Sequence, residues 1–280
     1  MVHIATEERK STEASEEPYV KTRVDGNIYH VILNRPAKRN SIPPAMVLDI
    51  EKAFIAADDH PEVRAIIVSA EGPVFSAGID LMSLGRDRSP NGQDPGRGLR
   101  RTSAILQRAF DCIEGTELPV IGAIQGHAIG LGLEFALSFD FRIATESCKF
   151  KLPETRLGLV PDVGGSTRLP RLVGTSRAKD MIMTSRSVPA DEALMWGLVN
   201  RVVPDDQLMQ AAEAFAQEIA KNAPLAVGMS KLVIDQGDGH DKVTQLALER
   251  WAQSQLITTE DLKEAVQSFV QKRDADFKGK

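Results

Sequence analysis

Two stretches of this chain share one arrangement that constrains its fold more than any other feature. VRAIIVSAEGPVFSAGIDL (63–81) and LPVIGAIQGHAIGLGLEFAL (118–137) each predict a buried strand, a glycine-containing turn and the start of a helix. Such a junction leaves main-chain N–H groups unpaired at a helix end whose dipole favours negative charge. If the two turns face each other, they supply two N–H donors to one developing oxyanion. The alternative is that the glycines only permit tight turns.

The remaining segments predict an α/β core followed by helices. Residues 19–36 alternate as in a β-hairpin, and Pro44 is expected to open an amphipathic helix. A loop rich in glycine, proline and charge is expected at 85–98, and a helix at 99–113. The predicted organisation has three parts: a mobile tail (1–18), an α/β core (19–204) and a helical region (205–280).

Three carboxylates stand in contexts that raise a question about chemistry. Glu134 lies in an almost wholly apolar helix, although a buried carboxylate without a partner is unfavourable. Glu154 follows a proline at the end of a short predicted strand, and Asp162 lies in a second proline-containing turn. Taken alone, Glu154 fits a solvated loop residue and Asp162 fits a turn residue.

Composition and missing motifs narrow the function. A formal net charge of −5 argues against a general nucleic-acid or membrane-surface role. The two cysteines form no CxxC pair, so neither a zinc site nor a disulfide framework is suggested. The glycine turns do not match GxGxxG, and PDVGGSTR lacks the lysine of a phosphate-binding loop. The first 18 residues are too polar for a signal peptide, so we expect a cytoplasmic protein without a membrane partner.

Together these features resemble the enoyl-CoA hydratase/isomerase (crotonase) superfamily. The resemblance spans nearly the whole chain from Tyr19 and rests on five segments in the family's order: NRPAKRNS (34–41), FSAGIDL (75–81), PVIGAIQGHAIGLGLEFALSFDFRIA (119–144), FKLPETRLGLVPDVGGSTRLPRLVG (150–174) and ADEALMWGLVNRVVP (190–204). It implies an α/β fold, a spiral of repeated ββα units, with a helical C-terminal region that packs subunits into trimers or hexamers. It also implies an acyl-CoA thioester as substrate.

The resemblance assigns roles to individual residues. The main-chain N–H groups of Ile79 and Leu131 form the oxyanion hole, although the family most often has glycine where Leu131 stands. Glu134 and Glu154 match the two glutamates that hold a water in the hydratases. The remaining substrate contacts expected in these turns are Ala77, Gly78, Asp80 and Gly130.

A mechanism follows from that assignment. The oxyanion hole stabilises the thioester oxygen as an enolate, and Glu134 and Glu154 add water across the double bond of a 2-enoyl-CoA. This chemistry is expected to need no metal or other cofactor. Lys38 and Arg39 are the expected contacts for the CoA phosphates. Phe277 with Lys278 is expected to reach the CoA of a neighbouring subunit.

Two alternatives remain open at this stage. Asp162, the long segment after SAGIDL and ITTEDLKEAVQS resemble the dienoyl-CoA isomerase branch, which uses a third acid to move double bonds. That branch usually has an aspartate where Glu134 stands. Some relatives bind RNA through a lysine-rich helix, but the matching segment here, EKAFIAADDHPEVR (51–64), holds more acid than base, so no nucleic-acid partner is expected.

The helices after Pro204 bear on assembly. Their apolar faces, which include Leu208, Ala212, Phe215 and Ile219, need a covering surface. We expect neighbouring subunits of a homotrimer or hexamer to provide it.

Overall fold

A six-stranded sheet forms the centre of the protein. The structure is a computed structural model that describes residues 17–84, 95–237 and 239–280. In order across the sheet, the strands are β1 (Val20–Asp25), β2 (Ile28–Leu33), β3 (Ala65–Ala70), β4 (Val120–Ile124), β6 (Phe141–Thr145) and β9 (Arg201–Val203). β1 and β2 form the expected antiparallel hairpin, and all other neighbours run parallel.

A smaller sheet continues from the large one. β5 (His127–Ile129) follows β4, and β7 (Lys149–Lys151) follows β6; β8 (Val188–Pro189) completes the sheet in the order β5-β7-β8. The chain therefore passes repeatedly from a strand of the large sheet to one of the small sheet and then to a helix. This is the expected spiral of ββα units.

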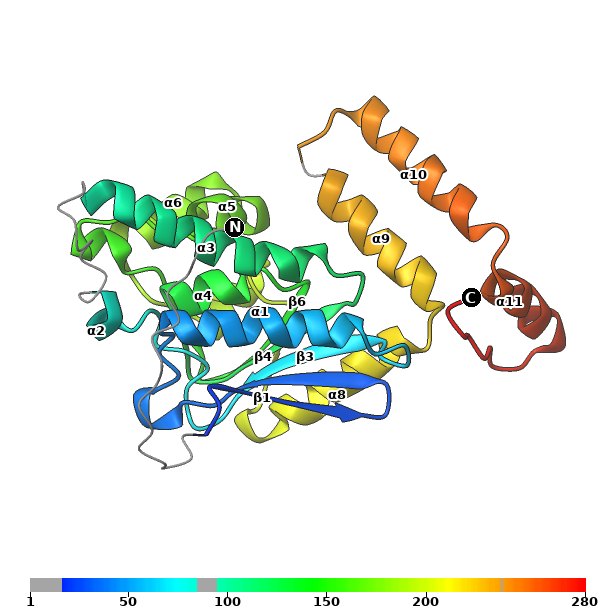
Figure 1. Ribbon diagram of the computed structural model, residues 1–280, viewed down its shortest axis with the longest axis horizontal. Coiled ribbons are helices and arrows are strands. Elements are labelled where there is room, and N and C mark those ends of the chain that lie inside the picture. Colours follow the sequence, from blue (N-terminus) through cyan, green and yellow to red (C-terminus); the bar gives the residue numbers. More distant parts are fainter. Residues whose placement is uncertain (1–16, 85–94, 238) are drawn as a thin grey trace, which may run out of the picture.

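Helices cover both faces of the large sheet (Figure 1). Those that precede residue 205 are α1 (Pro44–Asp58), α2 (Leu81–Leu84), α3 (Pro95–Gly115), α4 (Leu131–Ala136), α5 (Gly165–Val173), α6 (Thr175–Thr184) and α7 (Ala190–Trp196). α1 and α3 pack together over one face, whereas α8 (Leu208–Ala220) lies on the opposite face, against β3, β4 and β6. The main core lies under α1 and α3 and includes Phe54, Phe110 and Phe135.

The beginning of α3 differs from the sequence prediction. The helix starts at Pro95 rather than at Leu99, so the last residues of the expected 85–98 loop are helical. Proline fits the first turn of a helix, where its missing N–H leaves no bond unmade. Residues 85–94 and residues 1–16, where a loop and a tail are predicted, lie outside the described residues.

The apolar face of α8 is covered within the chain, which corrects the prediction that neighbouring subunits cover it. Leu208, Ala212 and Ala216 are buried against the large sheet, and Phe215 and Ile219 pack at the edge of the same cluster. The sequence pattern shows that this face is apolar, but it does not show what covers it. The predicted boundary between the α/β core and the helical region, after Pro204, stays a prediction. α8 follows that boundary in the sequence but packs on the core.

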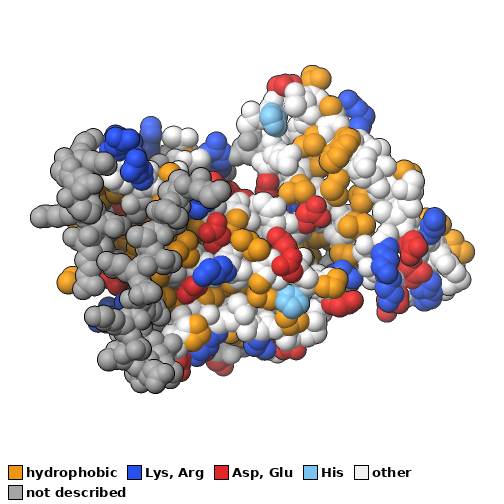
Figure 2. Space-filling view, viewed as in Figure 1, with side chains coloured by type: hydrophobic (Ala, Val, Ile, Leu, Met, Phe, Trp, Pro, Cys, Tyr) orange, Lys and Arg blue, Asp and Glu red, His pale blue; other side chains and the backbone are white. Residues whose placement is uncertain are grey.

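The last three helices lie to one side of this core (Figure 1). α9 (Pro224–Gly237) and α10 (Lys242–Leu256) pack side by side, and α11 (Glu260–Gln271) follows near the C-terminus (Figure 1). Figure 2 shows hydrophobic side chains gathered over α9 and α10. Several large ones are exposed on α10 and α11, such as Val243, Trp251, Val266, Phe269 and Val270. No helix in the described part of the chain is both long and apolar enough to span a membrane.

Candidate active site

The two strand–turn–helix junctions meet. The Ser76 N–H donates to His127 O at 3.0 Å, and the Ile129 N–H donates to Ser76 O at 3.1 Å. Ser76 and Ala128 thereby form a parallel bridge between the first turn and β5. The turns lie at the carboxyl ends of the adjacent parallel strands β3 and β4, where open α/β sheets usually bind ligands.

Gly78 makes the close approach possible. Its φ is +92°, and a Cβ there would lie 2.6 Å from Ile129 O and 3.5 Å from the Leu131 nitrogen. The next N–H in the chain belongs to Ile79. Among the residues that the structure describes, neither the Ile79 N–H nor the Leu131 N–H has an acceptor. Two adjacent unpaired donors are what an oxyanion hole requires.

A buried asparagine fixes the first turn. The Asn40 Nδ2 donates to Glu71 O at 2.9 Å and to Val74 O at 2.8 Å. The Ser76 Oγ donates to Asn40 O at 2.8 Å, and the Ala77 N–H donates to Arg39 O at 2.9 Å. The NRPAKRNS segment therefore holds the turn from outside it, which limits how far its N–H groups can move.

A cavity of about 150 Å³ lies in front of these N–H groups. It contains Ala77, Gly78, Ile79, Gly130, Leu131, Glu134, Glu154 and Asp162 from the predicted site. The structure thus brings both predicted glutamates and both predicted N–H donors to one cavity. Its mouth is apolar and solvent-exposed, with Leu81, Leu99, Leu157 and Val160 on its rim.

Glu134 is held in the wall of this cavity. It is only 2% exposed. Its Oε1 accepts the N–H groups of Val163 at 2.8 Å and Gly165 at 2.9 Å. Burial raises the pKa of Glu134 to about 7, against the lowering effect of the two N–H bonds; the charges of Glu154 and Asp162 raise it further. A carboxyl that titrates near neutral pH suits general acid–base work.

Glu154 lies across from Gly130. It begins a short 3-10 helix (Glu154–Leu157), and a Cβ on Gly130 would lie 2.8 Å from its Oε1. Its Oε2 is buried and has no hydrogen-bond partner in the described part of the protein. Burial first, and then the charge of Asp162, raises the pKa of Glu154. Glu154 therefore has an oxygen available to a substrate or a water.

Asp162 reaches the cavity with its side chain already bonded. Its Oδ2 accepts a hydrogen bond from the Ser103 hydroxyl of α3, and its main-chain oxygen accepts from Gln107 Nε2 at 2.5 Å. Sequence reasoning missed both α3 residues. Residues 99, 102, 103 and 106 of α3 line the cavity at helical spacing, so the helix predicted at 99–113 already placed them on one face. The sequence did not show that this face lies against the turn that contains Asp162.

The other predicted CoA contacts occupy two different places. Asp80 does not line the cavity; its carboxylate bonds to Arg35 at 2.8 Å, and that bond lowers its pKa. Lys38 and Arg39 are exposed beside the first turn. Phe277 and Lys278 lie away from both turns. The next residue, Gly279, is close to Arg64 at the amino end of β3, since a Cβ on it would lie 3.4 Å from the Arg64 guanidinium.

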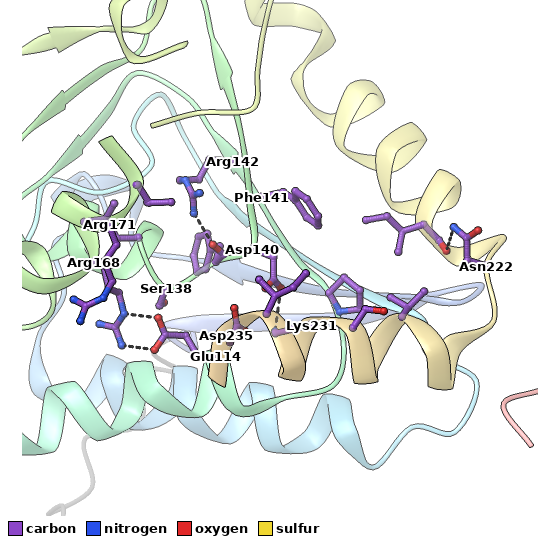
Figure 3. A pocket seen from close by; sticks show the side chains of 18 of the residues that line it. Glu114, Ser138, Asp140, Phe141, Arg142, Arg168, Arg171, Asn222, Lys231 and Asp235 are labelled. Carbon is purple, nitrogen blue, oxygen red and sulfur yellow. Dashed lines mark hydrogen bonds and ion pairs between the residues drawn. The ribbon is translucent and has the colours of Figure 1, made fainter. Parts of the chain in front are cut away.

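A larger cavity of about 640 Å³ lies between α9 and the core, away from the two turns (Figure 3). Four of its charged groups form two ion pairs. Lys231 Nζ lies 3.0 Å from Asp140 Oδ2, and Arg168 Nε donates to Glu114 Oε1 at 2.6 Å. These contacts tie α9 and α5 to the core. The smaller cavity, with its unpaired donors and available carboxylate oxygen, is the candidate active site.

Comparison with known proteins agrees with this geometry. The enoyl-CoA hydratase/isomerase family profile matches residues 23–280. The chain is 37% identical to the short-chain-enoyl-CoA hydratase of Clostridium acetobutylicum over 89% of this chain and 93% of that one. It is 36% identical to the carnitinyl-CoA dehydratase of Salmonella heidelberg, over 91% and 97%. A crystal structure of enoyl-CoA hydratase from Bacillus anthracis superposes with a TM-score of 0.87 at 34% identity, covering 94% of this chain and 100% of that one. The predicted spiral fold is confirmed, and the chain belongs to the enoyl-CoA hydratase/isomerase family.

Proposed function

We propose that this family member adds water across the double bond of a 2-enoyl-CoA thioester, or removes it in the reverse direction. The observation that carries the proposal is the shared cavity of Glu134, Glu154 and the two unpaired N–H groups of Ile79 and Leu131. A named hydratase and a named dehydratase among the relatives support the same chemistry.

The oxyanion hole accounts for activation of the substrate. An enoyl thioester becomes electrophilic at C3 as negative charge moves onto its carbonyl oxygen. N–H donors fixed in a cavity stabilise that charge, and each contributes on the order of 3 kcal/mol in comparable sites. Both donors here are main-chain groups of Ile79 and Leu131, so they need no side-chain reorganisation.

The two glutamates account for the proton transfers. One carboxylate takes a proton from water as the water oxygen bonds to C3, and a proton passes from the pair to C2. The pair ends with the same number of protons with which it began, and the product contains one added water. Glu134 acts through Oε2, since its Oε1 already accepts two N–H bonds. We propose that these steps use no metal or redox cofactor.

Dienoyl-CoA isomerisation is the second candidate, and the presence of Asp162 in the cavity favours it. That reaction needs an acid at the far end of a conjugated chain. The Asp162 carboxylate instead accepts the Ser103 hydroxyl, as expected of a residue that holds a turn. We therefore place hydration first.

A mass-based assay separates the two reactions. The protein is incubated with a 2-enoyl-CoA and with a 3,5-dienoyl-CoA, and each product is weighed. Hydration adds the mass of one water and should fall about 100-fold or more in Glu154→Gln, but only a few-fold in Asp162→Asn. Isomerisation without a mass change that collapses in Asp162→Asn would overturn the proposal.

We also propose a homotrimer or hexamer in which α10 and α11 contact neighbouring subunits. Their exposed side chains, Trp251 and Phe269 among them, support this assembly. Within one chain, Phe277 and Lys278 lie at the end of the sheet opposite the cavity. Any contact they make with CoA would therefore be with the CoA bound to a neighbouring subunit. Lys38 and Arg39, in contrast, would contact CoA bound in the cavity of their own subunit.

A further inference from the structure

One peptide group connects α3 to Glu134. The carbonyl of Asp162 and the N–H of Val163 belong to the same planar unit. Gln107 Nε2 donates to that carbonyl at 2.5 Å, and that N–H donates to Glu134 Oε1 at 2.8 Å. A continuous hydrogen-bond chain thus runs from Gln107 through the 162–163 peptide to the carboxylate.

The same turn is held a second time. Ser103 lies one helical turn before Gln107 on the same face of α3. Its hydroxyl donates to the Asp162 side chain while Gln107 holds the Asp162 main chain. Bonds to both parts of one residue fix the orientation of the following peptide as well as its position.

This hydrogen-bond chain matters because little else favours the ionised form of Glu134. No lysine or arginine is among the described residues that line the cavity. The charged neighbours Glu154 and Asp162 both disfavour the carboxylate, and only the N–H groups of Val163 and Gly165 favour it. Hydrogen bonds in a chain polarise one another, so the bond from Gln107 strengthens the N–H that Glu134 receives.

We propose that Gln107, which does not line the cavity, is a positioning residue that aims the 162–163 peptide at Glu134 and thereby controls when this carboxylate is ionised. Ser103 supports the same peptide from the Asp162 side chain. The inference rests on the proposed function in one respect, namely that Glu134 must be ionised at some step of turnover.

The test compares Gln107→Met with a matched variant of the next residue. Methionine keeps the length of the exposed side chain and removes the donor. Arg108→Met alters the same helix, but the Arg108 guanidinium lies 3.8 Å from Glu51 of α1 and has no bond to the turn. For each protein, kcat and kcat/KM for 2-enoyl-CoA hydration are measured from pH 5 to pH 9.

Losing the bond from Gln107 to the Asp162 carbonyl weakens the Val163 N–H bond to Glu134 and should raise the pKa of Glu134. We expect the acid limb of the Gln107→Met profile to move up by about one pH unit, which is a loss of about tenfold at pH 6 and almost none at pH 9. KM should change less than kcat. A merely structural role for Gln107 would instead lower activity by the same factor at every pH.

A second measurement does not depend on turnover. Isotope-edited infrared spectra of ¹³C-glutamate-labelled protein, with Glu134→Gln to assign the band, give the titration of Glu134 directly. An upward shift in Gln107→Met and a smaller one in Ser103→Ala support the inference even if wild-type protein hydrates no 2-enoyl-CoA, a result that would remove only the proposed function. Unchanged titration in folded Gln107→Met, or an equal shift in Arg108→Met, overturns it.

Discussion

Replacing Glu134 with glutamine should make the protein more stable while removing its activity. The amide oxygen can accept the Val163 and Gly165 N–H groups as Oε1 does, and the NH2 group takes the place of Oε2. The substitution therefore keeps the shape and both hydrogen bonds. The substitution removes a negative charge that is buried in the wall of the active-site cavity, where no lysine or arginine is among the described lining residues.

The size of the effect follows from the pKa. That of Glu134 is about 7 in the folded chain, against 4.5 for an ordinary glutamate. Since one pKa unit corresponds to about 1.4 kcal/mol, ionised Glu134 destabilises the folded state by up to about 3 kcal/mol at pH 8. The folded state binds this proton more tightly than the unfolded state does. Wild-type stability therefore falls as the pH rises from about 4.5 to about 7, and the advantage of Glu134→Gln grows over the same window.

Urea unfolding at pH 5 and at pH 8 measures this directly. The free energy of unfolding of Glu134→Gln should exceed that of wild type by a few kcal/mol at pH 8 and by much less at pH 5. Glu213→Gln, at an exposed position on α8, is the control and should match wild type at both. A Glu134→Gln protein that is no more stable than wild type at pH 8, or whose advantage is independent of pH, refutes the reasoning.

Three further substitutions test other parts of the structure. Gly165→Ala places a Cβ 3.0 Å from Glu134 Oε1, so we expect a loss of about 1–3 kcal/mol in urea unfolding and at least a tenfold fall in kcat. Lys231→Met removes the cation paired with Asp140, which keeps only the Val120 N–H among the described residues, and should lower the free energy of unfolding by about 3–5 kcal/mol. Phe269→Asp puts a charge where a subunit contact is proposed, so sedimentation should show a smaller particle with unchanged helix content.

Each of these three substitutions has a matched control. Gly115→Ala adds a methyl group in open space, Lys242→Met changes an exposed lysine, and Met183→Asp places a charge at an exposed position on α6. All three controls should behave as wild type. Normal turnover in Gly165→Ala, unchanged stability in Lys231→Met or unchanged particle size in Phe269→Asp would each contradict the corresponding argument.

The sequence predicted the parts of the site that depend on local geometry. The turns around Gly78 and Gly130 require glycine and a strand on one side, and both requirements can be seen within about ten residues of chain. Glu134 stood out because its neighbours are apolar and its burial needed an explanation. The hairpin β1–β2 and the strand β3 were likewise visible from short-range pattern alone.

Contacts between distant segments could not be predicted in this way. Gln107 meets Asp162 across 55 residues, and nothing in either segment names the other. The apolar face of α8 was visible, but the sheet that covers it lies elsewhere in the chain. Periodicity shows that a face is buried, whereas the partner is decided by how all the elements pack.

The main-chain origin of both proposed oxyanion donors also affects how this protein can evolve. A substitution at Ile79 or Leu131 changes the side chain but keeps the N–H, unless the new residue is proline. The groups proposed to transfer protons, in contrast, are side chains that single substitutions can replace. Under the proposed mechanism, most substitutions preserve stabilisation of the enolate, whereas a single substitution can change what the enolate becomes. Under selection for new double-bond chemistry, adaptive substitutions should accumulate first at Glu134, Glu154 and Asp162.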